Sequence, residues 1–198
     1  MNSYKTIKSF SEGIFKDRGS RFLSFAYPVD NEVMIKNIRA ELRKKYFDAN
    51  HHVYAFRIGA DKKIFRCSDD GEPANSSGPP ILGQIQSFEL TNILIVVVRY
   101  FGGTKLGIPG LFNAYRNAAI DAIKNAEIIQ IVEKQLFEIN FQYPSMGTVM
   151  HIIKESEIEV IKQEFLSQCT IQLSISKDLY EPIKQKFKEI RDCTFTTL

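Results

Sequence analysis

The chain contains no tryptophan and only three cysteines, and it lacks any long uninterrupted apolar run. Cys67, Cys169 and Cys193 form neither a paired nor a metal-binding pattern, so no zinc site is predicted and the thiols are expected to be reduced, as in a cytosol. No apolar segment approaches the roughly 20 residues of a membrane helix, and the first residues, MNSYKTIKSF, hold no signal-peptide core. The sequence therefore predicts a soluble cytoplasmic protein without a membrane partner.

Residues suited to nucleophilic catalysis are also scarce. His51, His52 and His151 are the only imidazole bases, and no serine lies in a G-x-S-x-G elbow. The chain has neither the phosphate-loop pattern nor G-x-G-x-x-G, and it has no aromatic and basic RNA-recognition signature. No catalytic residue, cofactor or metal ligand is therefore assigned from the sequence.

Positive charge is concentrated in the first part of the chain. Residues 1–130 contain 18 lysines and arginines against 13 aspartates and glutamates, whereas residues 131–198 contain 8 against 10. The pattern of apolar residues changes near residue 131, so we predict two domains, 1–130 and 131–198. The basic excess of the first domain favours an anionic partner, although it is smaller than that of a dedicated nucleic-acid-binding domain.

The strongest signal lies in residues 92–119, where a buried-strand pattern runs directly into a glycine cluster. Ile93–Val98 is an unbroken aliphatic run that predicts a central strand covered on both faces. Arg99 ends the run, and a glycine-rich loop leads into a predicted helix with Pro109 in its first turn. This order favours an anion site, and the alternative is a tight connection whose glycines adopt positive φ. The candidate anion-binding residues are Arg99, Gly102, Gly103, Lys105, Gly107 and Arg116.

A second basic group is predicted on the helix that follows the strand SRFLSFAYPV. Ile35, Ile38 and Leu42 recur at the spacing of a buried helix face. Three basic residues stand at i, i+3 and i+7 on another face: Lys36, Arg39 and Arg43. In one interpretation these residues meet phosphates, and in the other they form an ordinary solvated face.

Residues 68–80, SDDGEPANSSGPP, are predicted to form a long loop. The segment has no large apolar side chain, so we do not expect it to enter the core, and a loop of about 13 residues is often functional. Four residues near it form the only cluster suited to acid/base chemistry or to a hard metal ion, namely His52, Asp69, Asp70 and Glu72. In the alternative, Asp70 and Gly71 make a tight turn and the carboxylates cap backbone amides.

The pattern after residue 131 predicts the order βαββαβ, which is that of a ferredoxin-like domain. The expected strands are 132–143, 158–166, 169–176 and 192–197, and the expected helices are 144–156 and 178–190. In the first strand Phe137, Ile139 and Phe141 alternate with polar residues, so we expect one sheet face to be covered by helices and the other to be open. The open face binds a protein or RNA in one interpretation and packs on the first domain in the other.

The segments DANHHVYAFRIG, SDDGEPANSSGPPILGQI and VVVRYFGGTKLGIPGLFNAY together resemble the YigZ/Impact family of small cytoplasmic proteins. The resemblance covers essentially the whole chain and implies two α+β domains. The first is similar to a fold shared by a ribosomal protein and elongation factor G, with a left-handed crossover, and the second resembles the last domain of that factor. The family usually has arginine where this chain has Pro79 and Asn113, which implies weaker or different phosphate binding if those arginines contact phosphate.

Two functional hypotheses follow. The resemblance and the charge distribution favour a translation-associated regulator that binds RNA, the ribosome or a translation-related protein. Its predicted basic surface consists of Arg99, Lys105, Arg116 and the amides of Gly102 and Gly103, helped by Lys36, Arg39 and Arg43. The alternative is a hydrolase or transferase that acts on a phosphorylated substrate through Asp69, Asp70 or Glu72. Under both, we predict that the acidic loop folds over the RYFGG turn and that Arg99 bonds Asp70 or Glu72, because an unpaired buried charge is costly. The sequence does not specify an oligomeric state.

Overall fold

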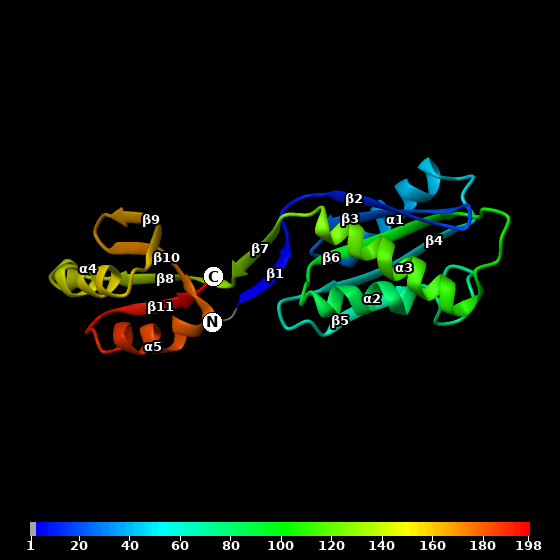
Figure 1. The fold of residues 1–198 in the computed structure, drawn as a ribbon. Coiled ribbons are helices and arrows are strands. Elements are labelled where there is room, and N and C mark those ends of the chain that lie inside the picture. The colour runs from blue at the N-terminus through cyan, green and yellow to red at the C-terminus, as the bar shows by residue number, and fades with distance from the viewer. Residues whose placement is uncertain (1–2) are drawn as a thin grey trace. The chain divides into compact units, whose positions relative to one another are not determined.

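The computed structural model describes residues 3–198, which separate into two compact units. One unit is Tyr4–Ile131 and the other includes Val132–Leu198 (Figure 1). Both units combine helices with sheets, which confirms the predicted α+β class. A separate two-stranded sheet pairs β1 (Ser3–Ile7) with β7 (Ile128–Val132). Among residues 3–198, no helix is both long enough and apolar enough to cross a membrane.

The Tyr4–Ile131 unit is built on a five-stranded antiparallel sheet with β6 at its centre. The strand order is β2-β3-β6-β4-β5. The strands are β2 (Ser11–Asp17), β3 (Ser20–Pro28), β4 (His51–Ile58), β5 (Ile64–Ser68) and β6 (Ile93–Tyr100). The register places Arg99 of β6 directly opposite Phe22 on one side and His51 on the other, so these three residues share a face.

Helices cover both faces of this sheet. The helix α1 (Glu32–Lys45) packs on one face in a core that includes Tyr54 and Val96. The helices α2 (Gly78–Ser87) and α3 (Gly107–Lys124) pack on the opposite face in a core that includes Val97 (Figure 1). Successive residues of β6 therefore enter two different cores, which confirms that Ile93–Val98 is covered on both faces.

The strand β2 is not predicted by the sequence pattern. Its side chains are mostly half-buried or exposed, and they lack the apolar alternation of a typical strand. A Cβ atom added to Gly13 would lie 2.6 Å from the backbone nitrogen of Ala122 in α3. The position of β2 thus depends on close approach to a helix rather than on a row of apolar side chains.

The second unit has the strand order β11-β8-β10-β9, which confirms the ferredoxin-like prediction. Its elements are β8 (Lys134–Phe141), α4 (Met146–Glu155), β9 (Glu159–Phe165), β10 (Cys169–Ser176), α5 (Lys177–Lys188) and β11 (Thr194–Thr197). Phe137 and Ile139 face a core shared with Val149 of α4 and Phe187 of α5. On the other face Glu138 accepts a hydrogen bond from Gln172 and Leu136 is 46% exposed, as expected of an open face.

Candidate functional site

The Tyr4–Ile131 unit contains a pocket where the end of β6 meets the start of α3, which we call the α3 pocket. Its volume is about 330 Å³. Three parts of the chain that are far apart in the sequence line it: Asn50 and His51; Glu72 and Pro73; and Arg99, Phe101, Lys105, Leu106, Gly107, Ile108 and Leu111. The acidic loop and the glycine-rich turn therefore belong to one site, as predicted.

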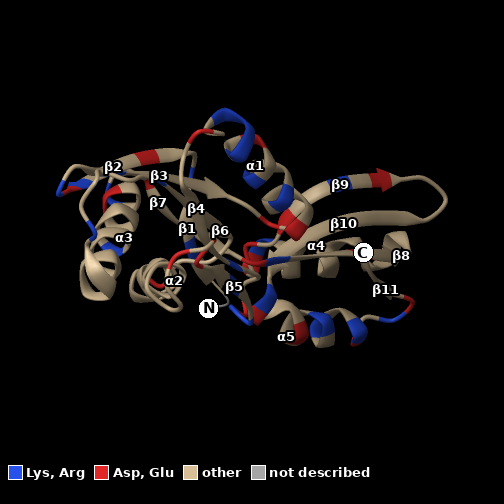
Figure 2. Ribbon diagram, turned by 90° about the vertical axis from the view of Figure 1, so that its right-hand side faces the viewer, with Lys and Arg blue, Asp and Glu red and all other residues tan. Residues whose placement is uncertain are grey.

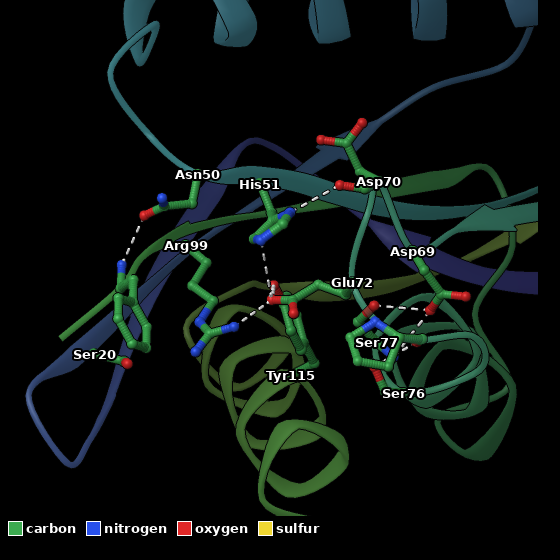
Figure 3. A network of polar contacts seen from close by, with 12 residues as sticks. Ser20, Asn50, His51, Asp69, Asp70, Glu72, Ser76, Ser77, Arg99 and Tyr115 are labelled. Carbon is green, nitrogen blue, oxygen red and sulfur yellow. Dashed lines mark hydrogen bonds and ion pairs between the residues drawn. The ribbon is translucent and has the colours of Figure 1, made fainter. Parts of the chain in front are cut away.

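The carboxylate of Glu72 is the centre of a buried network in this pocket (Figure 3). Its Oε1 atom accepts a hydrogen bond from Arg99 Nη1 at 2.6 Å and another from the Tyr115 hydroxyl at 2.7 Å. Arg99 is 5% exposed and Tyr115 is fully buried, so the pair is shielded from water. This contact confirms the predicted bond between Arg99 and a loop carboxylate.

Tyr115 is held in its neutral form by the same network. Burial and the neighbouring Glu72 carboxylate raise the pKa of the Tyr115 hydroxyl far above its ordinary value. The hydroxyl therefore serves as a hydrogen-bond donor and not as a base. In the sequence, Tyr115 recurs with Leu111 and Ala118 at helical spacing, which predicts a buried position but cannot show which partner a buried hydroxyl finds.

His51 faces the pocket with a fixed tautomer when its ring is neutral. Its Nδ1 atom lies 2.8 Å from the backbone oxygen of Asp70, and a carbonyl only accepts, so Nδ1 carries the hydrogen. The Nε2 atom lies 3.9 Å from Glu72 Oε1 (Figure 3). The sequence analysis did not select His51 for the site. Alternation along a strand indicates that His51 and His52 face opposite sides of the sheet, but only the register shows that His51 lies opposite Arg99.

His52, which was predicted to join the acidic cluster, instead points away from Glu72. Successive residues of β4 project from opposite faces of the sheet, so His51 and His52 cannot share one site. Only the backbone of His52 meets the cluster, where its N–H donates to Asp70 Oδ2 at 2.7 Å. Burial, followed by the nearby Arg43 charge, lowers the pKa of the His52 side chain. The structure thus corrects the predicted role of this residue.

The prediction that residues 68–80 stay out of the core is wrong. Ser76 and Ser77 are fully buried, and Glu72 is 9% exposed. The segment enters the interior because its polar groups bond one another: the Ser76 hydroxyl, for example, donates to the backbone oxygen of Pro73 at 2.7 Å. A loop without large apolar side chains can be buried when its hydrogen bonds are satisfied internally.

Asp69 connects this loop to the start of α2. Its Oδ1 atom accepts from the backbone N–H groups of Ser77 and Gly78, at 3.0 and 2.8 Å, and from the Ser77 hydroxyl at 2.7 Å. Its Oδ2 atom accepts from the Asn75 N–H at 2.9 Å. Burial alone would raise the pKa of the Asp69 carboxyl, but these donors, led by Gly78, lower it below its ordinary value. The residue therefore caps a helix, as the structural alternative proposed.

Replacing Asp69 with asparagine is expected to destabilise the Tyr4–Ile131 unit by roughly 2 kcal/mol at neutral pH, because hydrogen bonds to a charged acceptor are stronger than those to a neutral one. The folded pKa lies below the unfolded one, so this stability is present above the unfolded pKa and is lost as the pH falls through the folded pKa. Urea unfolding of parent and variant across this pH range should show the two stabilities converging in acid. A constant difference at every pH would contradict the assignment.

Asp70 has a third role, separate from those of Asp69 and Glu72. It lies in a turn with φ of 44°, followed by Gly71 with φ of 88°, and the Glu72 N–H closes the turn on the Asp69 carbonyl at 3.0 Å. Its carboxylate pairs with Arg43 of α1, Nη2 to Oδ1, at 2.6 Å. The three carboxylates thus have three different partners, and the described residues hold no cluster of His, Cys, Asp or Glu able to bind a metal ion.

The positive end of the pocket is formed by Arg99, Lys105 and the start of α3. Leu106, the N-cap residue of α3, has an apolar side chain that makes no capping hydrogen bond, so N–H groups of the first turn, apart from Pro109, which has none, remain for another acceptor. Arg99 Nε is buried and finds no hydrogen-bond partner among residues 3–198. Uncapped amides and an unsatisfied guanidinium group together suit a negatively charged ligand.

The predicted basic surface is not one surface, because its members lie in different places. Lys36 and Arg39 line a separate pocket beside α1, where the Arg39 guanidinium lies 3.6 Å from the centre of the Tyr54 ring. Arg43 is paired with Asp70. Arg116 is exposed on α3 and does not line the α3 pocket. Of the charged candidates, only Arg99 and Lys105 are brought together.

The glycines of the turn also divide by role. The Gly102 N–H donates to Ser20 Oγ at 3.1 Å, so this amide is already bonded and is not available to an anion, contrary to the prediction. Gly103 is exposed and has φ of 86°, and Gly107 begins α3 with φ of 72°. Both need a conformation that glycine adopts readily, as the tight-connection alternative proposed. Gly107 also lines the pocket, whereas Gly103 does not.

The two positions at which the chain departs from the expected family pattern lie outside the pocket. Pro79 is in the first turn of α2, and Asn113 is exposed on α3. Neither residue lines the α3 pocket. The residues that form the pocket are therefore present despite both replacements.

Sequence comparisons match this chain to IMPACT proteins, and a comparison with solved structures matches its fold. Residues 18–123 match the model of the Impact N-terminal domain. An IMPACT family member from Haemophilus influenzae is 32% identical over 187 residues, which are 93% of this chain and 89% of the relative. The IMPACT family member YigZ of Escherichia coli is 27% identical over 79% of this chain and 78% of its own. The crystal structure of a hypothetical protein aligns over 100% of this chain and 98% of that one, with a TM-score of 0.71 at 22% identity, and so shares the fold.

Proposed function

Because the chain belongs to the IMPACT family, we propose that it is a cytoplasmic, translation-associated regulator whose Tyr4–Ile131 unit binds RNA through the α3 pocket. One observation carries this proposal. The buried guanidinium of Arg99, whose Nε has no partner within residues 3–198, and the uncapped start of α3 meet in a single pocket. Both features favour a phosphate group over a neutral ligand.

Three further features support the proposal. The 18 basic residues against 13 acidic ones in residues 1–130 attract a polyanion, and α1 presents many of them (Figure 2). The resemblance to domains of elongation factor G and of a ribosomal protein supports ribosomal RNA as the partner. The three free cysteines, Cys67, Cys169 and Cys193, suit a reducing compartment.

Reversing the charge at Lys105 is the direct test of RNA binding. Lys105→Glu is expected to weaken binding of a short single-stranded RNA about tenfold at 50 mM salt, because a phosphate contact becomes a repulsion, and to reduce the salt dependence of binding by about one ion. Fluorescence anisotropy at several salt concentrations measures both quantities, and co-sedimentation with ribosomes extends the test to that partner.

Lys124→Glu is the matched control, because Lys124 is also exposed but lies at the far end of α3, outside the pocket. It makes the same change of net charge. If the two variants lose the same affinity, the pocket is not where RNA binds. If the parent binds no RNA even at low salt, the proposal fails altogether.

One observation favours the enzyme alternative, a hydrolase or transferase acting on a phosphorylated substrate. The Nε2 atom of His51 faces the pocket and Nδ1 is fixed by the Asp70 carbonyl, which is how a general base is oriented. The side-chain carboxylates of Asp69 and Asp70 take no part in this arrangement, because both are engaged in structural contacts. Release of inorganic phosphate from phosphorylated compounds, lost in His51→Ala, is the result that would favour the enzyme over the binding protein.

A further inference from the structure

We propose that the α3 pocket holds a single nucleotide that ends in a phosphomonoester, supplied either by a free mononucleotide or by the phosphorylated end of an RNA chain. This inference rests on the proposed RNA binding and specifies which part of the RNA enters the pocket. It is drawn from the depth of Arg99, the hydrogen-bond donors around the pocket and the position of one aromatic ring.

The depth of Arg99 favours the end of a chain over its middle. The side chain of Arg99 is 6% exposed and that of Glu72 is 4% exposed, so both lie deep in the pocket. An internal phosphodiester carries a nucleoside on each side, and both would have to enter with it. A terminal phosphate has only one such neighbour, so it can approach the guanidinium while the rest of the RNA stays outside.

The donors that remain around the pocket favour a terminal phosphate, which offers three free oxygens, over an internal phosphodiester, which offers two. Glu72 already compensates part of the Arg99 charge through their 2.6 Å contact. A ligand must therefore attract Lys105 and the uncapped amides of α3 as well, while it tolerates the nearby carboxylate. His51 Nε2 can add a hydrogen bond when that ring is protonated.

An aromatic ring at the pocket suits a base. Phe101 is 47% exposed, and its backbone N–H donates to Asn50 Oδ1 at 2.9 Å, which fixes the residue at the end of β6. Ile108, which is 58% exposed, adds a second apolar surface. Bases stack on such rings without regard to sequence, and a pocket of about 330 Å³ lies at the small end of the range for ligand sites, as expected for one nucleotide.

The experiment compares RNA oligonucleotides of one sequence that carry a 5′ phosphate, a 3′ phosphate or hydroxyl groups at both ends. Anisotropy at fixed salt should show at least tenfold tighter binding for one of the phosphorylated forms. Adenosine monophosphate should displace that oligonucleotide at concentrations where adenosine does not. The comparison of 5′ with 3′ forms, and of both with the free mononucleotide, distinguishes the possible sources of the phosphate.

Matched substitutions assign the preference to the pocket. Phe101→Ala should weaken binding of the phosphorylated form about fivefold to tenfold through loss of stacking, whereas Phe65→Ala should not, because Phe65 is 53% exposed on β5 and lies outside the pocket. Lys105→Ala should reduce the advantage of the phosphorylated form, and Lys124→Ala should leave it unchanged. All four residues are exposed, so the variants are expected to fold, and circular dichroism checks this.

Each remaining outcome overturns a defined claim. Equal binding of all three oligonucleotides would overturn recognition of a terminal phosphate but leave the proposed RNA binding intact. If inorganic phosphate competes as effectively as adenosine monophosphate, the nucleoside does not contribute to binding, and the claim that the pocket holds a nucleotide is overturned. Failure to bind any RNA would overturn both proposals together.

Discussion

Replacing Arg99 with alanine is expected to destabilise the Tyr4–Ile131 unit by about 3–5 kcal/mol, which is the usual range when one partner of a buried ion pair is removed. Within residues 3–198, the variant leaves the Glu72 carboxylate, whose side chain is 4% exposed, with the Tyr115 hydroxyl at 2.7 Å and His51 Nε2 at 3.9 Å as its close polar contacts. It also removes the guanidinium from beside the rings of Phe22 and Phe101, 5.4 and 5.6 Å from their centres. The same change should abolish the preference for a terminal phosphate.

Hydrogen exchange of the β6 amides is the suitable measurement, because it reports the opening of this unit by itself in a chain with two compact units. Exchange should be faster in Arg99→Ala, while the amides of β10 in the other unit should keep their parental rates. The β10 amides thus provide an internal control. Unchanged protection of β6 would show that the pair contributes little to stability.

A double-mutant cycle separates two contributions to the loss of stability: the loss of the contact between Arg99 and Glu72, and the cost of leaving one buried charge without a partner. Glu72→Ala removes the carboxylate and leaves Arg99 buried without its partner, so it should also be strongly destabilising. The variant that combines both substitutions leaves neither charge stranded, and it should lose less stability than the two single variants added together. Simple additivity would mean that the two side chains act independently despite their 2.6 Å contact.

The pairing of Arg99 was predictable because the sequence reveals that this charge is buried, and an unpaired buried charge carries a high free-energy cost. An arginine at the end of an aliphatic run that is covered on both faces is largely buried, and a buried charge needs a partner. The nearest acidic segment by composition was the loop that supplies Glu72. The ferredoxin-like order of the second unit was predictable for a similar reason, since alternation such as that around Ile139 specifies which face is buried.

The role of His51 required the strand register, which the sequence does not reveal. A shift of one residue in β4 would have turned His52 toward Arg99 instead, and both residues are equally suited to the site by chemistry. The sequence also does not reveal which face of the sheet α1 covers. For this reason Arg39 and Lys105 seemed to be parts of one basic region, although they line separate pockets.

The burial of the acidic loop was missed because apolar content is a poor guide when polar groups satisfy one another. Asp69 alone accepts bonds from four groups of residues 75–78, and the Ser76 N–H donates to the Pro73 carbonyl, so the backbone N–H groups of the buried Ser76 and Ser77 are both bonded. Such a network depends on the whole path of the chain. A pattern of residue types cannot specify it.

Replacing Gly102 with alanine is expected to destabilise the Tyr4–Ile131 unit by roughly 3 kcal/mol or more, beyond the usual cost of overpacking, because the new atom meets backbone. A Cβ at this position would lie 1.9 Å from the carbonyl carbon of Gly19 and 2.2 Å from the nitrogen of Ser20. The end of β6 must then separate from the turn between β2 and β3, which also breaks the bond from Gly102 N–H to Ser20 Oγ. Phe101, the adjacent residue, should move with it.

Gly103→Ala is the matched control, since it makes the same chemical change one residue later. Nothing lies within 4 Å of a Cβ at Gly103, so its cost comes only from φ of 86° and should be about 1–2 kcal/mol. Urea unfolding and RNA-binding measurements should therefore distinguish the two variants. Gly102→Ala should lose both stability and affinity for RNA, whereas Gly103→Ala should keep most of each. If both variants lose the same stability and affinity, the close approach of Gly102 to Gly19 is not the reason that glycine is needed after β6.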